Sequence, residues 1–135
     1  MIEVNNLTTN EIDEEFLKGV AKKVLEGEDK EKQELSIAMI GQGRIRELNK
    51  KYRGKNRATD VLAFSNKEIG LGEIVICFRE VKKNAKRFGS ILEKELARVL
   101  IHGILHLLGY NHEEDKLKAE EMRKKENYYL LQLKF

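Results

Sequence analysis

The sequence predicts a single α/β domain over residues 1–135, with a small mixed sheet of about four strands covered by about five helices. Apolar residues recur at helical spacing in some segments, and short apolar runs bounded by glycine or charged residues read as strands in others. The two kinds of segment alternate along the first half of the chain. A chain of 135 residues, 41% hydrophobic and 36% charged, is long enough to bury one core and too apolar to be disordered.

The elements are predicted in the order β, α, β, α, β, β, α, α, α. The strand at 35–40 has few polar residues, which is typical of a central strand. No helix fits between the strands at 61–64 and 73–78, so these two are predicted to pair antiparallel. Strands are predicted at 1–6, 35–40, 61–64 and 73–78, and helices at 9–26, 44–52, 79–88, from 90 to the glycine at 109, and from the acids after His112 to about 133. Ser90 with Glu93 predicts a capping box at the start of the fourth helix.

Composition excludes several classes of protein. The chain has no proline, no low-complexity tract and no apolar run of membrane-spanning length, and its N-terminus lacks a signal-peptide pattern. A cytoplasmic protein with no membrane partner is therefore expected. Its single cysteine, Cys77, cannot form an internal disulfide and lies inside a predicted strand, where it is expected to be buried.

The fourth helix carries two histidines in an otherwise apolar run. His102 and His106 are four residues apart, a spacing that places both rings on one helix face. A lone histidine in such a helix is usually a core residue, but two at this spacing are typical of a metal site.

A third histidine follows a glycine. In a continuous helix His112 would lie roughly 15 Å along the axis from His102 and on another face. Gly109 removes this obstacle, because glycine readily adopts the left-handed conformation that ends helices and reverses the chain. The spacing therefore predicts that His102, His106 and His112 converge on one metal ion, as three imidazoles do in catalytic zinc sites.

The histidine spacing equals that of the long zincin protease motif, with one difference. The glutamate that serves as the protease base is replaced by Gly103. Without this base, peptide hydrolysis is not expected.

A basic strip points to a different substrate. Seven Lys and Arg residues but only one acid, Glu47, occur between residues 44 and 57. Such a density favours contact with phosphate backbones, although a solvated helix face would look the same. Tyr52 in this strip is predicted to point inward with the core, with base stacking as the alternative. The seven basic residues are Arg44, Arg46, Lys50, Lys51, Arg53, Lys55 and Arg57.

Three blocks of the sequence resemble the YbeY family of bacterial metal-dependent endoribonucleases. They are HGILHLLGYNH at 102–112, LNKKYRGKNRATDVLAF at 48–64 and LGEIVI at 71–76. The blocks stand in the family's order and spacing, and the resemblance covers essentially the whole chain. The resemblance implies a zinc-dependent, single-strand-specific endoribonuclease that matures the 3′ end of small-subunit ribosomal RNA and acts in ribosome quality control. Its expected partners are single-stranded RNA, ribosomal RNA and the small ribosomal subunit.

The resemblance also implies roles for individual residues. One zinc ion is expected on His102, His106 and His112, the family's functionally important arginine falls on Arg53, and an acidic position falls on Glu73. Arg53 and Glu73 are therefore the expected catalytic residues, and we expect Arg53 to pair with the phosphate. Two other functions remain open: a non-catalytic ribosome assembly factor with a structural metal, and a metal hydrolase of another substrate.

Overall fold

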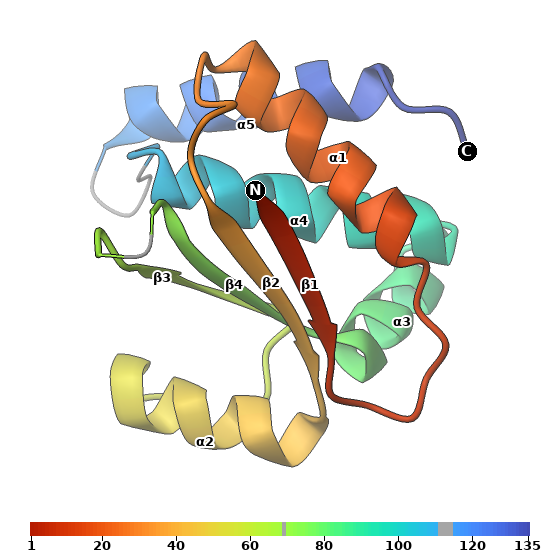
Figure 1. The fold of residues 1–135 in the computed structure, drawn as a ribbon. Helices are drawn as coiled ribbons and strands as arrows, with labels where there is room; N and C mark the ends of the chain where they lie inside the picture. Colours follow the sequence, from red (N-terminus) through yellow and green to blue (C-terminus); the bar gives the residue numbers. More distant parts are fainter. Residues whose placement is uncertain (69, 111–114) are drawn as a thin grey trace.

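The computed structural model describes residues 1–68, 70–110 and 115–135. In this part of the chain, four strands and five helices follow one another in the predicted order (Figure 1). They are β1 (Ile2–Asn6), α1 (Glu14–Gly27), β2 (Leu35–Ile40), α2 (Gln42–Arg53), β3 (Val61–Ser65), β4 (Gly72–Cys77), α3 (Phe78–Arg87), α4 (Leu92–Leu107) and α5 (Lys116–Leu131). The predicted α/β fold class is confirmed.

The strands form one mixed sheet in the order β1-β2-β4-β3. β1, β2 and β4 are parallel, whereas β3 pairs antiparallel with β4, as predicted from the short connection between them. β2 is central, as its apolar sequence indicates, and β3 is an edge strand. The antiparallel strand β3, which follows the basic strip in the sequence, therefore forms one edge of the sheet.

The helices cover both faces of the sheet. Among the described helices, α1, α3, α4 and α5 lie on one face and only α2 lies on the other (Figure 1). Successive residues of β4 alternate between these layers, because side chains along a strand point to opposite faces: Ile74 and Ile76 pack in the larger cluster, while Val75 and Cys77 pack against α2. Cys77 is fully buried, as predicted, and burial raises the pKa of its thiol.

α4 is the best-buried helix of the larger layer. Its apolar residues pack against β3, β4 and the helices α1, α3 and α5. This position explains why the helix is apolar on nearly every side. Within the described residues, no helix is both long enough and apolar enough to cross a membrane.

Several helix starts differ from the sequence prediction, and for α1 and α4 the structure shows the cause. α1 begins five residues later than residue 9, because the carboxylate of Asp13 caps it by accepting the backbone N–H of Phe16 at 3.0 Å. α4 begins at Leu92 with Ile91 as N-cap, so the capping box predicted for Ser90 is wrong. The backbone N–H of Ser90 instead donates to Ala85 at 2.8 Å and closes the end of α3.

Candidate active site

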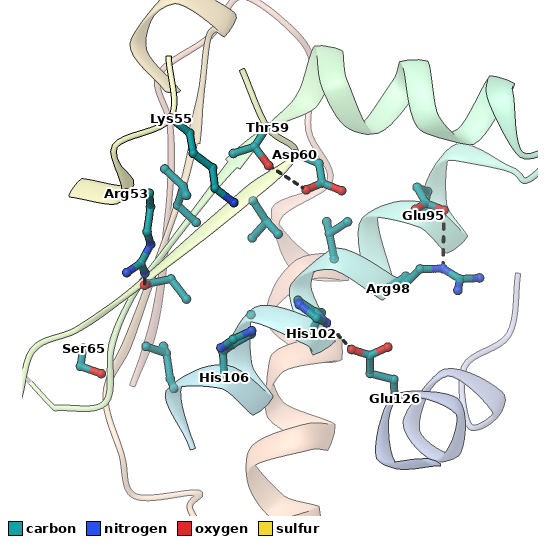
Figure 2. Close-up of a pocket in the computed structure, with 16 residues that line it drawn as sticks. Arg53, Lys55, Thr59, Asp60, Ser65, Glu95, Arg98, His102, His106 and Glu126 are labelled. Carbon is teal, nitrogen blue, oxygen red and sulfur yellow. Dashed lines mark hydrogen bonds and ion pairs between the residues drawn. The ribbon is translucent and has the colours of Figure 1, made fainter. Parts of the chain in front are cut away.

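A pocket of about 620 Å³ lies between α4 and the edge strand β3. His102 and His106 project into it from α4, while Arg53 and Lys55 lie on the opposite side, beside β3 (Figure 2). We call it the histidine pocket. Its polar lining residues are Arg53, Lys55, Thr59, Asp60, Ser65, Glu95, Arg98, His102, His106 and Glu126.

The histidines line the pocket because of helical spacing. His102 and His106 are half-buried, and their ring centroids lie 5.0 Å apart at an interplanar angle of 66°. Arg98 precedes His102 by four residues on the same helix face and also lines the pocket. The sequence prediction that one face of this helix presents both rings agrees with this arrangement.

Glu126 of α5 reaches the first histidine. Its Oε1 hydrogen-bonds Nδ1 of His102 (Figure 2). An ionised carboxylate can only accept a hydrogen bond, so it favours the imidazole tautomer with the proton on Nδ1. The lone pair of Nε2 is then directed away from Glu126, which is the arrangement that metal-bound histidines use.

The chain turns sharply after α4. Gly109 has a φ of 98°, its N–H donates to His106, and the N–H of Tyr110 donates to Leu105 at 3.0 Å. This pair of bonds is a Schellman motif, so the glycine stop predicted from the sequence is present. His112, the third predicted ligand, lies outside the described residues.

A partly buried carboxylate anchors this turn. Glu28, just after α1, accepts hydrogen bonds from the hydroxyl groups of Tyr110 and Tyr129 and lies 3.1 Å from Nζ of Lys125. Burial alone would raise the pKa of Glu28, but these three donors outweigh it and hold the pKa below its ordinary value. The hydrogen bond between Tyr110 and Glu28 raises the pKa of Tyr110 to about 12. Tyr110, two residues before His112, is thereby held against the end of α1 and against α5.

Arg53 reaches the histidine pocket from α2. Its Nη2 donates to the backbone carbonyl of Ala63 in β3 at 2.9 Å, and its guanidinium carbon lies 5.7 Å from the ring centroid of Phe64. These contacts hold the side chain against the sheet edge. Arginine has five N–H donors, so its use of one on Ala63 is compatible with binding a phosphate.

Glu73 is not brought together with the histidines. It neighbours Ile74 on β4 and therefore faces α2, where it lies 3.4 Å from the hydroxyl of Ser36 and lines a different cavity. The structure thus separates the two predicted catalytic residues: Arg53 lines the histidine pocket, and Glu73 lies on the opposite face of the sheet.

Among the described residues, three carboxylates that line the histidine pocket were not predicted from the sequence. They are Asp60, Glu95 and Glu126. Glu126 had a detectable signal, since it follows the buried Met122 by four residues and so shares its helix face. Glu95 carried a signal as well, since it precedes His102 by seven residues, two helical turns, and so shares its helix face. Asp60 carried none, because its approach to the pocket depends on how β3 packs against α4.

Gly103 lies where α4 crosses β4. A Cβ at this position would approach side-chain atoms of Ile74 at 3.2 Å, closer than side chains normally pack. The residue that replaces the zincin glutamate is therefore also a close-packing position between helix and sheet.

The donor set suits a metal ion. Two imidazoles one turn apart are ligands that zinc accepts, and the contact with Glu126 orients one of them. Within the described part of the chain, no three His, Cys, Asp or Glu side chains form a complete site. The pair from α4 supplies two donors of the three predicted.

The chain matches the family model described as Endoribonuclease YbeY over residues 3–134. It is 42% identical to the Endoribonuclease YbeY of Sulfurihydrogenibium sp. over 84% of this chain and 79% of that protein. It is 41% identical to the Endoribonuclease YbeY of Petrotoga mobilis over 96% and 92%. The solution structure of a Thermotoga maritima protein, 34% identical, superposes with a TM-score of 0.70 over 96% of this chain and 87% of that one. The chain therefore belongs to the YbeY endoribonuclease family.

Proposed function

We propose that this protein is a zinc-dependent endoribonuclease that cleaves single-stranded RNA in the histidine pocket. Its substrate is the 3′ end of small-subunit ribosomal RNA, and its cellular role includes ribosome quality control in the cytoplasm. Family membership supports the ribonuclease assignment, because the matched relatives carry the name Endoribonuclease YbeY.

One observation carries the proposal: the histidine pair and the cations Arg53 and Lys55 line the same pocket (Figure 2). The seven Lys and Arg residues of the basic strip are all exposed, so α2 and the loop after it, from which Arg53 and Lys55 reach the pocket, carry a positively charged surface. A polyanion is attracted to such a surface, whereas a peptide gains little from it.

The protein's own residues divide the work. Glu126 holds the proton of His102 on Nδ1 and orients its ring. Arg53 binds a non-bridging phosphate oxygen and stabilises the negative charge that develops there. Zinc bound by His102, His106 and His112 would supply Lewis acidity at the scissile phosphate.

The absence of a carboxylate at position 103 separates this site from peptidases. A Cβ at this position would crowd side-chain atoms of Ile74 at 3.2 Å, so a larger residue fits only if Ile74 shifts. The remaining carboxylates of the pocket have partners: Glu95 faces Arg98 with a 3.6 Å separation, and Asp60 accepts from Asn84 at 3.4 Å. The pocket is thus arranged to hold a phosphodiester between imidazoles and cations.

The test combines metal analysis with RNA cleavage. Zinc content and cleavage of a single-stranded RNA that carries the 3′ end of small-subunit ribosomal RNA are measured for the wild type, His106→Ala and Arg53→Ala. Arg123→Ala, an exposed arginine of α5 outside the pocket, is the matched control. Circular dichroism verifies that each variant folds.

The expected outcomes differ for the two site variants. His106→Ala loses both zinc and cleavage, while Arg53→Ala keeps zinc and loses at least about 100-fold in kcat/KM. If both folded variants cut RNA as fast as the control, the nuclease assignment is wrong. If the wild type binds zinc but does not cleave RNA, the result would support the alternative hypothesis of an assembly factor with a structural metal.

A further inference from the structure

A second cavity, of about 540 Å³, lies on the face of the sheet covered by α2. Tyr52 and Phe64 line it together with Glu73, the acidic residue that does not reach the histidines. Ser65 lines both this cavity and the histidine pocket. The two cavities are therefore neighbours at the end of the edge strand β3.

Tyr52 is an exposed aromatic ring at this cavity. It is 54% exposed, so the prediction that it packs inward with the core is wrong. Its ring contacts Phe64 edge-on, with centroids 5.3 Å apart, and Nζ of Lys51 lies 5.2 Å from its centroid. An exposed ring beside a cation is a surface on which an unpaired base stacks.

The charges around the cavity suit a nucleotide. Arg44 lines it, and the rest of the basic strip is exposed around α2. Arg53 connects the two cavities, because it lines the histidine pocket while its guanidinium lies over Phe64. A single-stranded RNA whose phosphate contacts Arg53 can therefore place an adjacent base on either side of β3.

We propose that this second cavity is a nucleobase subsite, in which an unpaired base of the RNA stacks on Tyr52 while a neighbouring phosphate contacts Arg53. This inference rests on the proposed function and extends it to substrate selection. Cavities of this size commonly hold small ligands when they are lined by aromatic side chains and a few polar groups.

Glu73 determines which base fits best. Its carboxylate only accepts hydrogen bonds, and guanine presents two adjacent donors, N1–H and the N2 amino group. Uracil offers one N–H flanked by two carbonyl oxygens, which the carboxylate repels. The subsite therefore prefers guanine to uracil, and Glu73 acts in specificity.

Binding of short oligonucleotides tests the subsite apart from cleavage. The probes are fluorescein-labelled single strands with 2′-O-methyl ribose, identical except for one guanine or uracil, and the dissociation constants are measured by anisotropy. The variants are Tyr52→Ala, Tyr52→Phe and Glu73→Gln. Tyr128→Ala is the matched control, because Tyr128 of α5 is 58% exposed and lies outside both cavities. Cleavage of the unmodified RNAs by the wild type is measured in parallel.

Tyr52→Ala is expected to weaken binding roughly 5- to 100-fold, and Tyr52→Phe and Tyr128→Ala to change it less than about twofold. The wild type is expected to bind the guanine probe at least about fivefold more tightly than the uracil probe, and Glu73→Gln to reduce this ratio. If the wild type cleaves RNA but Tyr52→Ala binds like Tyr128→Ala, only the subsite is refuted. If the wild type neither cleaves nor binds, the proposed function fails and the subsite fails with it.

Discussion

Glu126 on α5 and His102 on α4 are joined by a hydrogen bond between Oε1 and Nδ1, although 24 residues separate them in the chain. The contact exists because α5 packs along α4 and buries Met122, one turn before Glu126, in the same core. The helix that completes the core therefore also sets the orientation of a proposed metal ligand.

Removing this carboxylate should weaken metal binding. Glu126→Gln is expected to lower zinc affinity roughly 10- to 100-fold, because outer carboxylates fix the ring and increase its basicity. Competition with a chromophoric chelator measures the affinity without reference to activity. Glu120→Gln, an exposed acid of the same helix, is the control. Equal affinities for the two variants would contradict an orienting role for Glu126.

Gly103 should resist substitution by the protease residue. Gly103→Glu is expected to reduce the free energy of unfolding by about 2–4 kcal/mol, because the new side chain meets Ile74 at the helix–sheet contact. Urea denaturation measures the change. Gly19→Glu in α1 has open space at its Cβ and should be neutral or slightly stabilising. A Gly103→Glu protein as stable as Gly19→Glu would show that the contact does not constrain this position.

Glu28 should stabilise the fold above its titration range. Its folded-state pKa lies below the ordinary value of 4.5. Its contribution is therefore fully present above pH 4.5 and is lost as the pH falls through the lower folded pKa. Glu28→Gln is expected to cost about 1–3 kcal/mol at pH 7, because the hydroxyl groups of Tyr110 and Tyr129 lose a charged acceptor.

Denaturation curves across pH 3–7 test the dependence on Glu28, since the difference from the wild type should shrink on the acid side. Glu31→Gln, an exposed acid in the same loop, serves as the comparison. A stability difference that stays constant with pH would argue against an ionised Glu28 in the folded state.

Arg53 should not be replaceable by lysine. The guanidinium donates to Ala63 and keeps further N–H groups for a phosphate, whereas an ammonium group is a single compact donor centre. Arg53→Lys is expected to lower kcat/KM for RNA cleavage at least about tenfold while zinc content stays unchanged. Full activity in Arg53→Lys would mean that charge alone suffices at this position.

Local patterns account for much of the molecule. The element order, the central strand and the antiparallel pair β3–β4 all follow from apolar periodicity and connection length. The shared helix face of His102 and His106 and the turn at Gly109 depend only on helical geometry and on one residue's backbone freedom. These features require no knowledge of distant contacts.

Burial on both faces of β4 concealed the position of Glu73. Ile74, Val75, Ile76 and Cys77 are all buried, so the strand shows no alternation from which its facing could be read. Competition for Ser90 caused another error, since the end of α3 uses its N–H before α4 begins. The local sequence pattern therefore allowed Glu73 to lie on either face of the sheet and α4 to begin at either Ser90 or Leu92.

By itself, the sequence determined the elements, their order and the histidine pair, because helix and strand periodicities and a glycine stop act over only a few residues. Only the tertiary structure decided that Glu126 reaches His102, that Arg53 crosses to the histidine pocket, and that Glu73 faces α2. The physical reason is that these positions depend on how α5, α2 and β4 pack on one core, and such packing joins residues far apart in the chain.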